Sequence, residues 1–264
     1  MSVALRVDEL SIQFGGVAAV RGVSFSVKRG QILAIIGPNG AGKTTLFNMI
    51  SGLYRPSSGR VHLKDEDVTG FPPYKLARAG VSRTFQNLQV FMGQTVLENV
   101  MIGRCRWEDT SLIADLLHLP SVRRQNSISE EHAWAALRQV KMEQYAHTMA
   151  SNLSYGSLKR LELARALASE PDVLLLDEPA AGCNAVETAE IEEIVKGIAA
   201  SKEAIAIVLI EHDMKMVMRL SDNVLVLNQG QILAYGPPDA VRHNAAVIEA
   251  YLGTHAKEVE HAQN

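Results

Sequence analysis

Hydrophobic residues alternate with polar ones in three separate parts of this chain. The alternation occurs in the second half of residues 3–14, and in residues 23–27 and 61–64. A period of two predicts strands that bury one face and expose the other. Strands of this kind are typical of antiparallel sheets, so we expect the first 64 residues to contribute an antiparallel β layer.

Other apolar segments are uninterrupted, which predicts strands that are buried on both faces, as in a parallel sheet. These segments cover residues 32–36, 173–176 and 204–210, with a further short strand expected at 81–85. Two more apolar segments, 224–227 and 232–235, flank Gln229-Gly230 and predict a hairpin. Helical spacing of three and four residues occurs between the strands, at 74–79, 158–168, 187–200 and 214–220. Strands that alternate with helices in this way predict an α/β fold.

The stretch from residue 88 to residue 165 has a different character, because few of its residues favour strands. Helical spacing occurs at 95–101, 113–117 and 130–140, whereas 120–129 is polar. We therefore expect a helical subdomain, at about 88–165, inserted into one α/β domain that covers residues 1–253. Residues 254–264 are expected to form a polar tail.

Composition narrows the class of protein. The chain has 264 residues, 47% hydrophobic and 21% charged, with a formal net charge of −3. The core is therefore ample, and the charge gives no basis for expecting nucleic acid as a partner. The two cysteines have no metal-binding spacing and suggest a reducing compartment. No apolar run approaches the roughly 20 residues that span a bilayer, and no signal-peptide pattern is present. We expect a soluble, cytoplasmic chain.

Residues 37–44 match the phosphate-binding pattern G-x-x-x-x-G-K-[ST] and lie between a predicted strand and a predicted helix. The glycines allow successive backbone N–H groups to point into one concavity, and the helix N-terminus adds partial positive charge there. We expect Lys43 to reach the β- and γ-phosphates and Thr44 to offer its hydroxyl to Mg²⁺. The expected nucleotide-binding residues are Gly37, Pro38, Asn39, Gly40, Ala41, Gly42, Lys43, Thr44 and Thr45.

Two acids, Asp177 and Glu178, follow the apolar strand at 173–176. The carboxyl ends of parallel strands are the edge where such sheets bind ligands. We expect Asp177 to hold Mg²⁺ and Glu178 to orient and deprotonate the attacking water. The guanine-reading pattern N/T-K-x-D is absent, so the sequence favours ATP over GTP.

Residues 153–157, Leu-Ser-Tyr-Gly-Ser, open a predicted helix about twenty residues before Asp177. They resemble the L-S-G-G-Q signature of the ATP-binding cassette (ABC) family. The resemblance implies the ABC ATPase fold, which is a RecA-like P-loop NTPase core with an antiparallel β layer and an inserted helical subdomain. It also implies that Ser154, Gly156 and Ser157 bind the γ-phosphate held by a second subunit, so that two chains enclose two ATP molecules head to tail.

The same resemblance implies roles for three further residues. Phe14 matches the aromatic residue that stacks on adenine. Gln86 matches the glutamine that senses Mg²⁺ and water where the transmembrane partner docks, and His212 matches the switch histidine that contacts the γ-phosphate. The expected catalytic residues are Glu178, His212 and Gln86. The expected metal ligands are Thr44, Gln86 and Asp177.

Two motifs depart from the family pattern. Tyr155 and Ser157 replace a glycine and the glutamine of the signature, and Cys183-Asn184 stand in the cross-dimer D-loop where the family often has Leu and Asp. The phosphate loop, the two acids and His212 match the pattern, so we still expect ATP hydrolysis.

Further stretches resemble the longer ATPase subunit of branched-chain amino-acid importers. They cover residues 14–20, 37–48, 83–87, 95–100 and 250–253. The resemblance implies a chain bound to the cytoplasmic face of the inner membrane through two transmembrane permease subunits. It also implies a second ABC ATPase subunit, identical or different, and an extracytoplasmic substrate-binding protein.

Alternatives remain at this point. Related branches move urea or short amides, and a lipopolysaccharide-export ATPase is similar. Outside transport, the alternatives are a soluble ABC protein that acts on ribosomes or DNA, and a small-molecule kinase. Soluble ABC proteins usually carry two cassettes or long coiled-coil inserts, which this chain lacks, and a kinase gives no reason for the signature. The transported molecule cannot be read from the ATPase.

Overall fold

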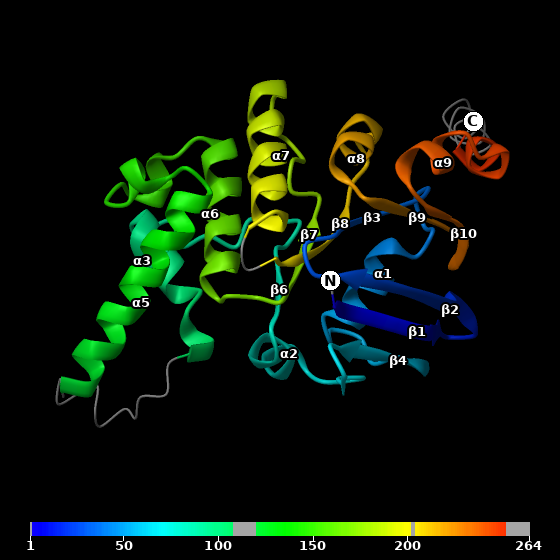
Figure 1. Ribbon diagram of the computed structural model, residues 1–264, viewed down its shortest axis with the longest axis horizontal. Helices are drawn as coiled ribbons and strands as arrows, with labels where there is room; N and C mark the ends of the chain where they lie inside the picture. The colour runs from blue at the N-terminus through cyan, green and yellow to red at the C-terminus, as the bar shows by residue number, and fades with distance from the viewer. Residues whose placement is uncertain (1, 108–119, 202–203, 252–264) are drawn as a thin grey trace.

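Two β-sheets, with helices packed around the larger one, make up the fold (Figure 1). The computed structural model describes residues 2–107, 120–201 and 204–251, so the predicted helix at 113–117 and the predicted tail at 254–264 lie outside the described residues. The larger sheet contains, in spatial order, β10 (Gln231–Gly236), β9 (Asn223–Asn228), β3 (Ile32–Ile36), β8 (Ala206–Ile210), β7 (Val173–Asp177) and β6 (Val81–Arg83). The smaller sheet contains β2 (Val17–Lys28), β1 (Val3–Phe14), β4 (Ser58–Leu63) and β5 (Glu66–Asp67).

The smaller sheet is antiparallel throughout, which confirms the antiparallel layer. Strand β2 begins at Val17, six residues before the predicted start at residue 23. Gly22 lies in the left-handed region with φ of 59° and interrupts the alternation of apolar and polar residues. The sequence pattern therefore shows only the second half of the strand.

The larger sheet is parallel from β6 to β9, and β10 joins it in antiparallel pairing. Every residue of β3, β7 and β8 is buried, as the uninterrupted apolar segments predict. The turn between β9 and β10 is formed by Gln229 and Gly230, whose φ angles of 49° and 79° are those of a two-residue hairpin turn. The predicted hairpin is confirmed.

Helices cover both faces of the larger sheet. They include α1 (Lys43–Ile50), α2 (Pro73–Ala79), α3 (Val96–Ile102), α5 (Pro120–Gln139), α6 (Tyr155–Ala168), α7 (Ala185–Ala199), α8 (Met214–Leu220) and α9 (Pro238–Arg242), with 3-10 helices at Cys105–Trp107, Glu143–Tyr145 and Ala150–Asn152. Leu46 and Phe47 of α1 are buried in one core together with residues of both sheets. A second core joins the opposite face of the larger sheet to α3 and to helices α5 to α9. None of the helices among the described residues is long and apolar enough to cross a membrane.

Helix α5 starts at Pro120, ten residues before the predicted start at residue 130, so the predicted start of this helix is wrong. The polar residues there lie mostly on the exposed face, while Val122 and Ser129 are buried. Proline is well tolerated in the first turn of a helix because its missing N–H has no partner there in any case.

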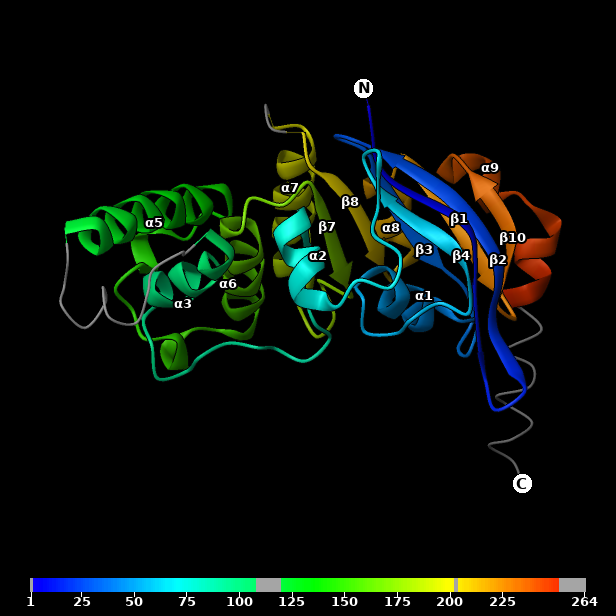
Figure 2. The ribbon, with the colours of Figure 1, turned by 90° about the horizontal axis from the view of Figure 1, so that it is seen from below.

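Helices α3, α5 and α6 pack against one another at the end of the molecule opposite the antiparallel sheet (Figure 2). Helix α3 begins with a capping box, in which the Thr95 side chain accepts from the N–H of Glu98 and the Glu98 carboxylate accepts from the N–H of Thr95. The division of the chain into a core and an inserted subdomain at 88–165 stays a prediction.

Candidate nucleotide-binding site

The phosphate loop, residues 37–44, joins β3 to α1 and requires glycine at two positions. Gly37 and Gly42 have φ angles of 151° and 102°, which residues with a side chain rarely adopt. A Cβ atom on Gly42 would lie 2.6 Å from the carbonyl oxygen of Ala19, and a Cβ on Gly37 would lie 2.1 Å from that of Leu227. Neighbouring backbone therefore approaches the loop too closely for any side chain.

The β9–β10 turn closes over the same loop. The N–H of Gly230 donates to the carbonyl oxygen of Ala41 at 2.9 Å, and the carbonyl oxygen of Gly230 accepts from the N–H of Arg21 at 2.8 Å. Gly230 thus bridges strand β2 and the phosphate loop, which fixes the loop between segments from both ends of the chain.

Lys43 is the first residue of α1, and its side chain is buried beneath the loop. Its Nζ donates to the carbonyl oxygens of Gly37 at 2.7 Å and Pro38 at 3.0 Å. Burial holds the pKa of the Lys43 amine below its ordinary value, and the negative charge of Glu178 acts in the opposite direction. The ammonium is therefore placed where it can exchange loop carbonyls for phosphate oxygens.

Glu178 follows β7 and has a φ of 51°, in the left-handed region that non-glycine residues seldom occupy. Its side chain is 14% exposed and forms an ion pair with Nε2 of His212. Nε2 of Gln86 donates to the other carboxylate oxygen at 3.4 Å. The structure thus brings together the three residues that the sequence predicts to be catalytic.

These side chains and the phosphate loop surround one hollow of about 380 Å³. Its walls are formed by Ala19, Asn39, Gly40, Ala41, Gly42, Lys43, Thr44, Thr45, Gln86, Glu178, Ile210 and His212. Sequence reasoning missed Ala19 and Ile210, because both are ordinary apolar strand-end residues with no motif around them.

Asp177 does not line this hollow but pairs with a residue that sequence reasoning also missed, Arg83. Its Oδ2 accepts from a terminal nitrogen of Arg83 at 2.8 Å, and both side chains are buried. The available signal was a single arginine inside the predicted strand at 81–85, an unusual place for a positive charge.

The chain was compared with known proteins. The family described as "ABC transporter" matches residues 20–181. The chain belongs to the ABC transporter family. The family described as "Branched-chain amino acid ATP-binding cassette transporter" also matches, at residues 231–257. The chain is therefore an ATP-binding and ATP-hydrolysing ABC subunit, as the sequence predicts.

Curated ABC relatives cover almost the whole chain. The "High-affinity branched-chain amino acid transport ATP-binding protein BraF" of Pseudomonas aeruginosa is 43% identical over 249 residues, which is 94% of this chain and 97% of the relative. The protein named LivG of Escherichia coli K12 gives the same identity and coverage. A probable LivG of Archaeoglobus fulgidus is 34% identical over 97% of this chain and 98% of its own length.

Two solved ABC structures share the fold. A nucleotide-free cassette has a TM-score of 0.80 at 32% identity, covering 94% of this chain and 98% of its own. The ADP conformation of an ATP-binding cassette has a TM-score of 0.82 at 32% identity, covering 96% of this chain and 100% of its own. The antiparallel layer, the mixed larger sheet and the surrounding helices are thus those of an ABC ATPase.

The signature residues of this ABC cassette lie outside the hollow. Ser154 is the N-cap of α6 and accepts from the N–H of Ser157 at 3.3 Å. A Cβ atom on Gly156 would lie 2.4 Å from the carboxylate of Glu187, so that a side chain there would require Glu187 to shift. Phe14 also lies outside the walls of the hollow, and its ring packs edge-on against Tyr54 with centroids 5.4 Å apart.

The donor set around the hollow fits Mg²⁺. Mg²⁺ keeps several waters and binds through one or two carboxylates together with substrate phosphates. Among the described residues no cluster of three or more His, Cys, Asp or Glu could hold a metal alone, which is consistent with this mode. The Thr44 hydroxyl, at the start of α1, and the Gln86 amide both line the hollow.

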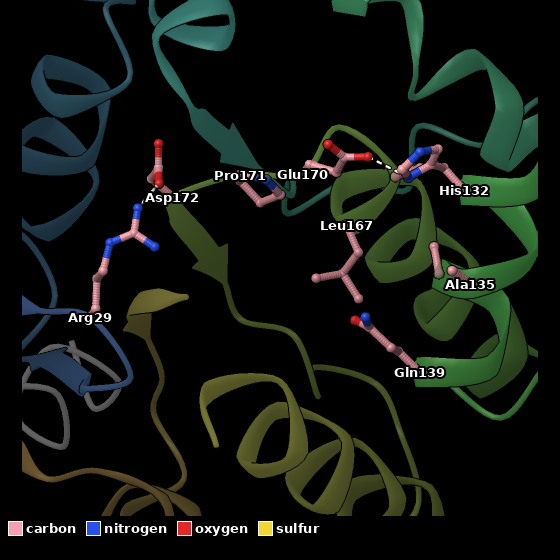
Figure 3. Close-up of a pocket in the computed structure, with 10 residues that line it drawn as sticks. Arg29, His132, Ala135, Gln139, Leu167, Glu170, Pro171 and Asp172 are labelled. Carbon is pink, nitrogen blue, oxygen red and sulfur yellow. Dashed lines mark hydrogen bonds and ion pairs between the residues drawn. The ribbon is translucent and has the colours of Figure 1, made fainter. Parts of the chain in front are cut away.

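A second hollow, of about 320 Å³, lies between α5 and the loop that joins α6 to β7 (Figure 3). It is at the amino end of β7, whereas Glu178 follows the carboxyl end. Its charged groups pair with one another, His132 with Glu170 and Arg29 with Asp172. None of the residues that the sequence predicts for the site lines this hollow.

The D-loop cysteine gives a testable consequence of its surroundings. Burial raises the pKa of the Cys183 thiol, and the negative charges of Glu187 and Glu211 raise this pKa further. The positive charge of Lys159 lowers it. Since the thiolate is the reactive form, we expect Cys183 to react with iodoacetamide several-fold more slowly at pH 8 than the exposed Cys105. Rates measured on the Cys105→Ser and Cys183→Ser variants test this, and equal rates would contradict it.

Proposed function

We propose that this chain is the ATP-hydrolysing subunit of an importer for branched-chain amino acids. The observation that carries the proposal is the match to relatives of that name at 43% identity along nearly the whole of both chains. The separate match at residues 231–257 supports it, because it covers a part of the chain outside the nucleotide site.

The assembly that we propose contains two transmembrane permease subunits, a second ABC ATPase subunit and an extracytoplasmic substrate-binding protein, with this chain on the cytoplasmic face of the inner membrane. Two ATPase subunits would meet head to tail. The positions of Ser154, Gly156 and Ser157 support this arrangement, because they lie at the N-terminus of α6, outside the hollow of their own chain.

In the proposed reaction the N–H groups of the phosphate loop and Lys43 bind the phosphates of ATP. Gln86 and His212 hold the Glu178 carboxylate, which orients a water and accepts its proton as the water attacks the γ-phosphate. Thr44, Asp177 and Gln86 would hold Mg²⁺, which neutralises charge on the phosphates when bound. Phe14, whose side chain is 45% exposed, would stack on adenine.

We place permease docking beside Gln86. Two adjoining hollows of about 230 and 200 Å³ lie there, and we call them together the docking groove. Phe85, Leu53 and Ile102 line the groove and are 40%, 48% and 41% exposed, respectively. Exposed apolar side chains around a concave surface are typical of a protein interface.

Replacing Phe85 by serine is expected to reduce recovery of the permease subunits with this chain at least tenfold, since one large apolar anchor contributes on the order of 2 kcal/mol. ATP binding should be retained. Ile248→Ser, at a side chain that is 46% exposed on the C-terminal helical segment, is the matched control. Equal recovery with both variants would contradict docking in the groove.

The assignment as a whole is tested by purifying the tagged chain gently from its own membranes. We expect two multi-span proteins, a shorter ATPase and a binding protein whose ligand is a branched-chain amino acid. A binding protein whose ligand is urea or an amide, or partners of lipopolysaccharide export, would instead assign the chain to a related branch of the ABC transporter family. Ribosomal proteins would overturn transport and leave the ATPase intact.

A further inference from the structure

Arg83 connects three elements of the ATP-binding core. From β6, one terminal nitrogen of its guanidinium donates to Oδ2 of Asp177 at 2.8 Å. The other donates to Oδ1 of Asn48 at 2.7 Å and to Oγ of Ser51 at 2.8 Å, both in the last turn of α1 or directly after it. One buried side chain therefore ties the helix that follows the phosphate loop to the strand that carries the two acids.

The guanidinium also lies between two aromatic rings. Its central carbon is 5.5 Å from the ring centroid of Phe47 and 5.5 Å from that of Phe85. Phe47 is fully buried in the core, whereas Phe85 is exposed in the docking groove and directly precedes Gln86. Arg83 itself forms part of the wall of both hollows of that groove.

Asp177 depends on this arginine for its orientation. Its side chain is 7% exposed, and a buried carboxylate is stable as an anion only when it is paired. The residue that follows β6 assists, because Oγ1 of Thr84 accepts from the N–H of Asp177 at 3.3 Å. Residues 83 and 84 thus fix both the side chain and the backbone of the acid.

We propose that Arg83 is a positioning residue for the metal-binding carboxylate of Asp177, and that Phe85 links this pair to the docking groove. The inference rests on the proposed function, in which Asp177 holds Mg²⁺ and the groove receives a permease. A partner that moves Phe85 would shift the guanidinium, and Asp177 would follow because its Oδ2 is bonded to the same group. The side chain of Arg83 then connects the docking groove directly to the metal-binding carboxylate of Asp177.

The test compares Arg83→Lys with the wild-type chain. Lysine keeps the charge but cannot donate to Asp177, Asn48 and Ser51 at once in the planar geometry of arginine. We expect the ADP-loaded variant to bind Mn²⁺, measured by electron paramagnetic resonance, about tenfold more weakly, which corresponds to roughly 1.4 kcal/mol. The Mg²⁺ concentration for half-maximal ATPase should rise by a similar factor, and ADP affinity in EDTA should stay within about twofold.

Arg104→Lys is the matched control. Arg104 is also a buried arginine, paired with Glu170 and lying over the ring of Trp107, but it is remote from the nucleotide. It should lose a similar amount of thermal stability and keep the wild-type affinity for Mn²⁺. An equal Mn²⁺ affinity in Arg83→Lys and Arg104→Lys would reduce Arg83 to a structural role and overturn the proposal.

Two milder variants keep the test decisive if Arg83→Lys folds poorly. Asn48→Ala removes one anchor of the guanidinium and should weaken Mn²⁺ binding in the same direction by a smaller factor. Phe85→Ser should do so in the isolated subunit, and an unchanged Mn²⁺ affinity in Phe85→Ser would overturn the link to the groove. If ATP hydrolysis by the wild-type chain does not depend on a metal ion, the proposed function itself is contradicted. A wild-type chain that needs the metal, together with an unaffected Arg83→Lys variant, contradicts only the role of Arg83.

Discussion

Replacing Glu178 by glutamine is expected to lower ATP turnover about 10³-fold, within the range of roughly 10²–10⁴ that a general base contributes. Glutamine has nearly the same shape and can still bond to Gln86 and His212, but it cannot accept the proton of the attacking water. ATP binding should therefore survive. An ATP-bound dimer should accumulate, visible by size-exclusion chromatography with Mg²⁺ and ATP.

The control for this variant is Glu192→Gln. Glu192 is also a largely buried carboxylate, and it pairs with Arg219 of α8. Its replacement by glutamine therefore removes a buried negative charge that takes no part in the proposed reaction. Turnover should then stay close to that of the wild-type chain. A Glu178→Gln variant that turns over ATP as fast as Glu192→Gln would exclude Glu178 as the catalytic base.

Replacing Lys43 by alanine is expected to weaken ATP binding by roughly 100-fold and to abolish measurable turnover. A hydrogen bond to a charged group contributes about 1.5–3 kcal/mol, and each 1.4 kcal/mol is a factor of ten in affinity. The substitution also removes the donor to the carbonyl oxygens of Gly37 and Pro38, which loosens the loop before nucleotide arrives.

A fluorescent ATP analogue measures the affinity directly. Lys141→Ala is the control, because its amine is 61% exposed and pairs with Glu193 on the surface, where such pairs contribute little. An affinity for Lys43→Ala within a few-fold of this control would place the phosphates somewhere other than the loop.

The residues that sequence reasoning found are those with local signals. The phosphate loop is a contiguous motif, and Glu178 and His212 each follow a recognisable strand whose carboxyl end faces the same edge of the sheet. Parallel pairing of β7, β8 and β3 then places them together without further information. This is why the hollow contains the predicted catalytic residues.

The residues that it missed depend on packing between distant segments. Arg83 meets Asp177 across a separation of 94 residues, and nothing near either residue indicates the pair. The start of α5 was missed for a different reason, because residues 120–129 are mostly polar and Val122 is the one hydrophobic side chain among them described as buried, which is too few to show a helical period. The direction of the Phe14 ring depends on Tyr54, which follows α1 and belongs to none of the motifs.

The hydrogen bond from the N–H of Gly230 to the carbonyl oxygen of Ala41 has a consequence during synthesis of the protein. The phosphate loop at residues 37–44 is translated early, but the turn that closes over it, Gln229-Gly230, is translated much later. At a synthesis rate of about 5–20 residues per second, the motif waits on the order of ten seconds or more for this turn. A nascent chain interrupted before residue 230 carries every residue of the loop but lacks the hydrogen bond from Gly230 to Ala41, so we expect it to bind ATP more weakly than the full chain does.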